Sequence, residues 1–249
     1  MKREKLLYSG KAKSIYATKD PAVCILEFRD DATAFNGVKK ASFPYKVMIN
    51  NYYNAFFMEK LAAAQIPTHL IKRLSDTDSL VYPLEMLLVE CVIRNVTAGN
   101  LCKRLGVPQG VALTPPIFEF FLKNDALNDP MINEDHIRAF GWASNEEIIL
   151  LKQLTFQIND ILQPLFTHAG LLLVDFKLEF GHLNGQLVLG DEITLDGCRI
   201  WDAKTHESLD KDRFRKDLGQ VMEGYLEVAN RLGIDIPVVL GKFDAYASS

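Results

Sequence analysis

Hydrophobic side chains recur at helical spacing in three stretches of the chain. They do so over residues 47–64, and again in a stretch that opens with a capping-box sequence at Ser144 and ends at Gly170. Side chains three and four positions apart lie on one face of an α-helix, so each stretch would present a continuous apolar stripe. We therefore predict two long amphipathic helices. A third is predicted over residues 210–232, where Gly233 suits a left-handed helix end.

Strand patterns fill much of the remaining sequence. Residues 8–16 and 23–28 predict the two strands of a hairpin, and β-branched or apolar runs predict further strands over 69–74 and 87–96. Two or three more strands are expected between the last two helices. Because strands and helices mix without a regular β-α-β alternation, we expect an α+β fold with antiparallel sheets and flanking helices.

The length and composition allow a sizeable core in one or two lobes. The chain has 249 residues, of which 48% are hydrophobic, so it can bury enough apolar surface to fold. The connector at residues 82–86 is the expected boundary. We predict an N-terminal lobe over residues 1–84 and a C-terminal lobe over residues 85–249.

The charge balance argues against nucleic acid and membranes as partners. With 28 Lys and Arg against 32 Asp and Glu, the formal net charge is −4, so no overall positive field attracts a polyphosphate chain.

The apolar runs are too short for a membrane span, and the N-terminal apolar stretch is too short for a secretory signal. The 4 cysteines form no C-x-x-C pair and are interpreted as reduced thiols. We expect a cytoplasmic protein.

Several common catalytic motifs are absent from the sequence. It contains no G-x-G-x-x-G, no P-loop, no H-E-x-x-H, no G-x-S-x-G and no kinase H-R-D signature. Standard Rossmann and P-loop proteins, zinc proteases, serine hydrolases with a nucleophile elbow and ordinary protein kinases are therefore excluded.

The stretch over residues 171–181 is the most informative one. With a period of two, Asp175, Lys177 and Glu179 lie on one face of a strand whose other face is apolar. One interpretation is a half-exposed antiparallel strand with a solvated charged face. The other is a site in which the charged face meets a ligand.

The turn that follows decides where Asp191 lies. A three-residue loop with Gly185 in the left-handed position would place Asp191 opposite Lys177 and diagonal to Glu179. A two-residue turn at Asn184 and Gly185 would send Asp191 to the opposite face. In the first register two carboxylates and a lysine converge, as magnesium bound to a triphosphate requires.

Cationic side chains mark two further places. Arg94 ends a strand just before small residues at 97–100 that open a short helix, and Arg199 lies in a later strand. A guanidinium beside free backbone N–H groups suits a phosphate, although a surface arginine would show the same pattern. Lys11 and Lys13 alternate on the first strand and fit either a ligand site or a solvated hairpin edge.

Several of these segments, taken together and in order, resemble the SAICAR synthetase family of purine biosynthesis. The segments that carry the resemblance are residues 10–13, 31–37, 89–99, 174–181 and 189–202. The resemblance implies a two-lobed fold with a nucleotide cleft between the lobes, and a homo-oligomer. It also implies an ATP-dependent ligase that joins carboxyaminoimidazole ribonucleotide (CAIR) and L-aspartate through an acyl phosphate, releasing ADP and phosphate.

The same resemblance implies roles for individual residues. ATP would be covered by an N-terminal hairpin and contacted by Lys11, Lys13 and Met86. The ribonucleotide would be bound by Asn36, Arg94, Gly99, Asn100 and Arg199. Glu179 and Asp191 would hold Mg²⁺ in the C-terminal lobe, while Asp175 and Lys177 would face the reacting groups.

Two features depart from the family pattern, and two other functions compete with it. Asn100 stands where serine is common, and residues 43–47 lack the glycine that members often have in this stretch.

A small-molecule kinase could use the same lysines and carboxylates, and a nucleotide-binding regulatory module could use them without turnover. Dependence of ADP release on aspartate separates the ligase from the kinase.

Overall fold

The computed structural model describes most of the chain. It covers residues 1–10, 12–29, 31–34, 39–43 and 45–237, with the backbone alone at 31–34 and 39–42. Lys11 and Asn36, two of the predicted ligand-binding residues, lie outside the described residues.

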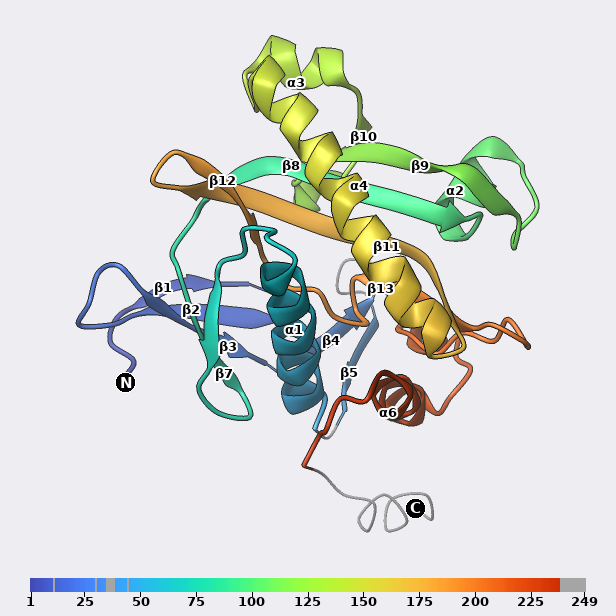
Figure 1. The fold of residues 1–249 in the computed structure, drawn as a ribbon, viewed down its shortest axis with the longest axis horizontal. Coiled ribbons are helices and arrows are strands. Elements are labelled where there is room, and N and C mark those ends of the chain that lie inside the picture. Colours follow the sequence, from blue (N-terminus) through green and yellow to red (C-terminus); the bar gives the residue numbers. More distant parts are fainter. Residues whose placement is uncertain (11, 30, 35–38, 44, 238–249) are drawn as a thin grey trace.

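The smaller sheet is antiparallel and is built from the N-terminal part of the chain (Figure 1). Its strands, in spatial order, are β1 (Leu6–Ser9), β2 (Lys13–Ala17), β3 (Cys24–Phe28), β7 (Asp78–Val81) and β6 (Leu70–Arg73). The short strands β4 (Asp31–Ala34) and β5 (Lys39–Ser42) pair with each other.

The predicted single strand over residues 8–16 is wrong. Tyr8 pairs with Ile15 in β2, so the chain reverses between β1 and β2. The amide of Gly10 donates to the carbonyl of Lys13 at 2.9 Å, which closes a tight turn. Alternation along the sequence continues through such a turn, and only the pairing reveals it.

The larger sheet is also antiparallel and carries the charged strand face. Its strands are β8 (Glu85–Val96), β9 (Ala112–Leu122), β10 (Met131–Ile132), β11 (Leu171–Leu183), β12 (Gln186–Gly190) and β13 (Cys198–Asp202). The order is β10-β9-β8-β11-β12, with β13 paired to β11. The expected α+β class with antiparallel sheets and flanking helices is confirmed.

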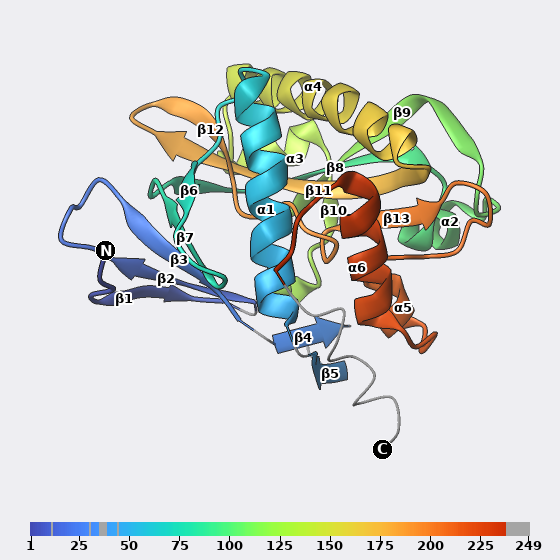
Figure 2. The same ribbon diagram turned by 60° about the horizontal axis from the view of Figure 1, so that its bottom comes forward.

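Two long helices pack around the sheets (Figures 1 and 2). They are α1 (Lys46–Ala63) and α4 (Asn145–His168), and both predicted helices are confirmed. The capping box at Ser144 is present in both directions, with Ser144 and Glu147 each accepting from the other's backbone amide. Phe57 of α1 stacks on Phe166 of α4 with ring centroids 5.6 Å apart, so the main core continues from the N-terminal part into the larger sheet. The predicted division at residues 84 and 85 stays a prediction.

The predicted helix over residues 210–232 is wrong in one respect. The structure has two helices, α5 (Asp212–Arg215) and α6 (Val221–Leu232). Gly219 and Gln220 between them have φ angles of 67° and 50°, a left-handed conformation that interrupts an α-helix. Gly233, with φ of 71°, ends α6 as predicted.

The remaining elements are short. They are α2 (Gly99–Leu105), the 3₁₀-helix at Asp125–Leu127 and α3 (Glu134–Phe140). The 4 cysteines are free thiols, and Cys102 is the partly exposed one among them. Within the described ranges, no helix is long and apolar enough to cross a membrane.

Candidate active site

The charged face of the larger sheet lines a pocket. Its volume is about 370 Å³, a size suited to a small-molecule ligand. Its polar and charged lining residues are Glu90, Arg94, Asn100, Asp129, Asp175, Lys177, Asp196, Arg199 and Arg215. The two predicted catalytic residues and three of the predicted ribonucleotide-binding residues therefore converge.

Strand register brings three of these side chains together. Asp175 of β11 pairs with Arg94 of β8 on one side and with Arg199 of β13 on the other. Residues at paired positions of neighbouring strands project to the same face of a sheet. Asp175 and Glu179 are only 4% and 3% exposed, which excludes a solvated strand face.

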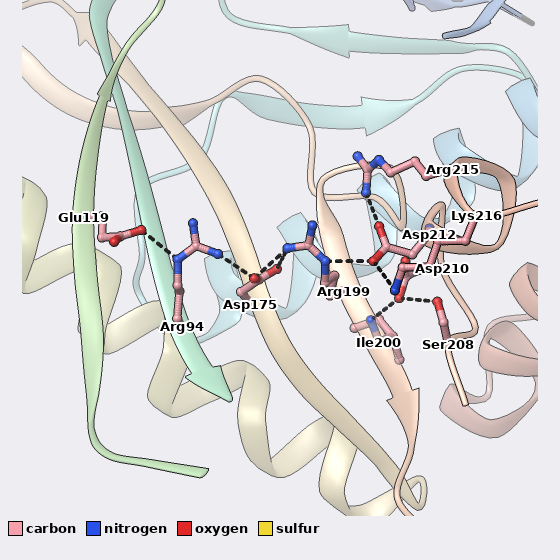
Figure 3. Close-up of polar contacts among 10 residues, drawn as sticks. All are labelled: Arg94, Glu119, Asp175, Arg199, Ile200, Ser208, Asp210, Asp212, Arg215 and Lys216. Atoms are coloured by element: carbon pink, nitrogen blue, oxygen red, sulfur yellow. Dashed lines mark hydrogen bonds and ion pairs between the residues drawn. The ribbon is translucent and has the colours of Figure 1, made fainter. Parts of the chain in front are cut away.

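A chain of ion pairs crosses this face (Figure 3). The carboxylate of Asp175 accepts from Arg94 Nη1 at 2.8 Å and from Arg199 Nη1 at 2.7 and 3.0 Å. Buried charges are tolerated when each one is paired in this way. Asp175 was predicted to face the reacting groups, and in the structure its carboxylate joins the two arginines.

Two carboxylates outside the pocket extend the chain. Glu119 of β9 accepts from Arg94 Nε at 2.6 Å, and Asp212 of α5 accepts from Arg199 Nε at 3.0 Å. Asp212 also accepts from Arg215 Nη1 at 2.7 Å. Burial alone would raise the pKa of Asp212, but the charges of Arg199 and Arg215 outweigh it and hold this pKa well below its usual range.

Gly99 is required by the position of Arg199. Its φ is +56°, and a Cβ atom there would lie 2.6 Å from Arg199 Nη2. Any other residue at 99 would be strained and would push the guanidinium away. Gly99 therefore shapes the arginine site through packing.

Lysines dominate the other end of the charged face. Lys177 Nζ donates to Glu90 Oε1 at 2.7 Å and also contacts Glu179, which Lys123 contacts as well. Burial would raise the pKa of Glu179, but Lys177 and Lys123 lower it to about 2. Burial raises the pKa of Glu90 to about 6 despite the opposing effect of Lys177. One lysine thus lies between two acids of different proton affinity.

The predicted register of the hairpin after β11 is wrong. Leu183 pairs with Gln186 and Glu179 pairs with Gly190, so the loop is the two-residue turn at Asn184 and Gly185. Their φ angles are 51° and 80°. Two left-handed residues make the turn type that matches the natural twist of a hairpin, and an Asn-Gly pair favours it. Asp191 therefore does not lie opposite Lys177.

Asp191 still reaches the charged region, from beyond the end of β12. It has a left-handed backbone with φ of 57°, which breaks the strand alternation. Lys13 of the smaller sheet contacts both Asp191 and Glu192. The positive charge of Lys13 also lowers the pKa of Glu179, but this effect is smaller than those of burial, Lys177 and Lys123. Lys13 therefore connects the smaller sheet to the predicted metal ligands.

The predicted metal ligands Glu179 and Asp191 are both carboxylates, the hard oxygen ligands that magnesium prefers. Among the described residues, no group of 3 or more His, Cys, Asp or Glu side chains could form a metal site built by protein alone. Mg²⁺ commonly takes one or two carboxylates and completes its shell with phosphates and water. Two carboxylates such as Glu179 and Asp191 would be enough for a magnesium ion held jointly with a nucleotide.

Met86 lies beside this end of the sheet and not in the lining of the pocket. It is 36% exposed, and its Sδ atom is 3.0 Å from the place where a Cβ atom on Gly190 would be. The side chain of Met86 therefore packs over the backbone of Gly190 in β12.

Lys46, in the stretch that departs from the family pattern, supports the pocket wall. Lys46, the first residue of α1, is buried and contacts Asp196 of the lining. Asp196 also accepts from Tyr225 Oη of α6 at 2.6 Å. An N-terminal helix thus holds the segment between Asp191 and Arg199.

Several residues of the site were not predicted. They are Glu90, Glu119, Lys123, Glu192, Asp196, Asp212 and Arg215. The charge of Glu90 inside an apolar strand was the one available signal. Asp212 and Arg215 lie within the predicted helix over residues 210–232, but no role in the site was predicted for them. The others lie on a strand and loops that the pattern did not predict, so their role depends on the fold.

The fold is α+β, and the pocket has a pair of arginines at one end and lysines with carboxylates at the other, an arrangement suited to anionic small molecules. A sequence model of the SAICAR synthetase family matches residues 6–232, and the chain belongs to this family. Phosphoribosylaminoimidazole-succinocarboxamide synthase of Nitrosococcus oceani is 60% identical over 235 residues, covering 94% of this chain and 99% of the relative. The enzyme of the same name from Idiomarina loihiensis is 59% identical over 236 residues, covering 95% and 100%.

Solved structures of the family have the same fold. The crystal structure of phosphoribosylaminoimidazole-succinocarboxamide synthase from Ehrlichia chaffeensis gives a TM-score of 0.90 at 46% identity, covering 93% of this chain and 99% of that one. A SAICAR synthetase in complex with ADP gives a TM-score of 0.90 at 44% identity, covering 94% and 100%.

Proposed function

We propose that this protein is the ATP-dependent ligase that joins CAIR to L-aspartate, giving SAICAR, ADP and phosphate in purine biosynthesis. The observation that carries this proposal is similarity to enzymes of this name over nearly the whole chain, 60% identity in one case. The pocket has the chemistry that the reaction needs. The free cysteine thiols of the chain suit a reducing cytoplasm.

The arginine end suits the phosphate of the ribonucleotide. Arg94 and Arg199 line the pocket beside Asn100, whose amide can donate a hydrogen bond. Planar guanidinium groups recognise phosphate oxygens through paired hydrogen bonds. We assign the ribonucleotide phosphate to this end.

The lysine end suits activation of the CAIR carboxylate. A carboxylate oxygen of CAIR attacks the γ-phosphorus of ATP, ADP leaves, and an acyl phosphate forms. The neutral amine of aspartate then attacks the acyl carbon, phosphate leaves, and the amine nitrogen loses a proton. Lys177, which lines the pocket between Glu90 and Glu179, would stabilise the negative charge on the transferred phosphoryl group.

The nucleotide would lie between the two sheets, near Lys13 and Met86. A structural relative was solved in complex with ADP, which supports nucleotide use by this chain. When bound, magnesium would neutralise charge on the nucleotide phosphates. Glu179 and Asp191 are the residues that would hold it.

The experiment is to measure ADP release with each combination of substrates. The proposal expects sustained ADP release when ATP, CAIR and L-aspartate are all present, with one SAICAR formed per ADP. Undiminished steady turnover without aspartate would indicate a kinase or phosphatase. Nucleotide binding without turnover would indicate a regulatory module.

A further inference from the structure

We propose that Glu119 and Asp212, two buried carboxylates behind the pocket, are positioning residues that orient Arg94 and Arg199 toward the ribonucleotide phosphate. This inference rests on the proposed function, because it assigns that phosphate to the arginine end. Neither carboxylate lines the pocket, whereas both arginines do. Glu119 can therefore act on the ligand only through Arg94, and Asp212 only through Arg199 or Arg215, which also lines the pocket.

The two contacts have the same geometry. Each carboxylate accepts from the Nε atom of its arginine, Arg94 at 2.6 Å and Arg199 at 3.0 Å. Each arginine then donates through Nη1 to the shared acceptor Asp175. A planar guanidinium held at both Nε and Nη1 cannot rotate about its own axis. None of these contacts uses Nη2, and Nη2 of Arg199 lies against Gly99 at the start of α2.

Burial and charge keep both carboxylates in this role. The side chains of Glu119 and Asp212 are only 3% and 4% exposed, so water competes little for them. Each carboxylate also contacts another cation, Arg104 for Glu119 and Arg215 for Asp212. The acceptors are thereby fixed before any ligand arrives, and the arginine side chains lose less freedom when phosphate binds.

The test is a pair of isosteric substitutions, Glu119→Gln and Asp212→Asn. Each keeps the shape but weakens the charged acceptor. We expect the KM for CAIR to rise about 10- to 100-fold, the loss typical of a hydrogen bond to a charged group or of an outer support residue. The KM values for ATP and aspartate should stay within about 2-fold.

The matched control is Glu134→Gln on α3. Glu134 also joins two cations, Arg138 and Lys152, both at 2.6 Å, and does not line the pocket. This variant should leave all three KM values unchanged. A similar rise in the KM for CAIR in the control would overturn the inference, because loss of any carboxylate bridging two cations would then suffice.

A double-mutant cycle separates positioning from a general effect on the fold. In the Arg94→Lys background, E119Q should add less than about 2-fold, because the Nε contact is already gone. In the Arg199→Lys background, E119Q should keep its full effect. D212N should add less than about 2-fold in the Arg199→Lys background and should keep its full effect in the Arg94→Lys background. The inference would be overturned if E119Q or D212N raised the KM for CAIR by the same factor in both backgrounds. It would also be overturned if they raised the KM for ATP as much as the KM for CAIR.

The same data distinguish this inference from the function on which it rests. If R94K and R199K leave the KM for CAIR unchanged, the proposed phosphate site fails, and the inference with it. If R94K and R199K raise this KM but E119Q and D212N do not, the inference alone fails. Asp212 also supports Arg215 at 2.7 Å. If D212N therefore does not fold, the cycle with E119Q decides the proposal.

Discussion

The two ends of the charged face hold their cations in different ways. At one end Arg94 and Arg199 are fixed by carboxylates on two sides, with contacts of 2.6 to 3.0 Å. At the other end Lys177 lies between Glu90 and Glu179. Arginine presents a rigid planar fork, whereas lysine is a point charge on a flexible stem. The first arrangement suits an anion that stays in place, and the second suits a phosphoryl group that moves during reaction.

Both ends nevertheless contain two neighbouring acids with separated pKa values. At the lysine end the pKa of Glu179 is about 2 and that of Glu90 about 6. At the arginine end the pKa of Asp212 is lowered, whereas burial first and then the charge of Asp212 raise the pKa of Asp210 to about 6. In each pair the acid with more cation contacts keeps its charge, and the other holds a proton more readily.

The largest effect is expected from Lys177→Met. This change removes the ammonium group that we propose contacts the transferred phosphoryl group, so kcat should fall about 1000-fold, as for loss of a transition-state charge contact. The measurement is single-turnover ADP formation at saturating substrates. Lys152→Met, at a lysine 41% exposed on α4, is the control and should retain full kcat. A fall of less than about 10-fold in K177M would remove the lysine end from the chemistry.

The pH dependence of stability tests the arginine end. The folded state raises the pKa of Asp210 from 3.8 to about 6 and so binds this proton more tightly than the unfolded chain does. Asp210 therefore adds stability at low pH, and about 3 kcal/mol of it is lost as the pH rises through this window. The stability of Asp210→Asn relative to the native protein should rise with pH accordingly.

Urea unfolding at about pH 4, 5, 6 and 7 measures this difference. Asp135→Asn on α3, at a side chain 90% exposed, is the control and should give a constant difference. A constant difference for D210N would show that the two ends do not share the pattern of paired acids.

The proposed metal ligands are tested by Glu179→Gln and Asp191→Asn. Each variant keeps the shape and removes a formal charge, so the Mg²⁺ concentration for half-maximal activity should rise by about 30- to 100-fold. The KM for CAIR at saturating Mg²⁺ should change little. The control is Glu227→Gln on α6, whose carboxylate pairs with Arg231 at 2.8 Å. An unchanged Mg²⁺ requirement in both site variants would contradict the assignment.

Arg94→Lys sharpens the comparison most directly, because it places a lysine at the arginine end. The charge remains but the fork is lost, so binding of CAIR should weaken by roughly 1 to 3 kcal/mol. Calorimetry with CAIR and with ATP measures it, and ATP binding should be little affected. Equal losses for both ligands would mean that Arg94 supports the fold or the nucleotide site. Arg138→Lys, at an exposed arginine of α3 with carboxylate partners, is the control.

Local patterns in the sequence determined the two long helices and the charged strand of this protein. Helical spacing predicted α1 and α4, and the capping box at Ser144 located the start of α4. Alternation placed Asp175, Lys177 and Glu179 on one face of β11. Such signals depend on residues close together in the chain, and the quoted motifs were enough to indicate the family.

The tertiary structure alone decided how these elements combine. The register of the β11–β12 hairpin followed from the φ angles of Asn184 and Gly185, which the sequence left open between two turns. The contacts of Glu119 with Arg94 and of Asp212 with Arg199 join residues from different elements. The sequence pattern of a charged strand face is the same whether that face is exposed to water or packs against other charged groups. Only packing across strands decides which of these occurs, because burial makes each charge depend on a partner distant in sequence.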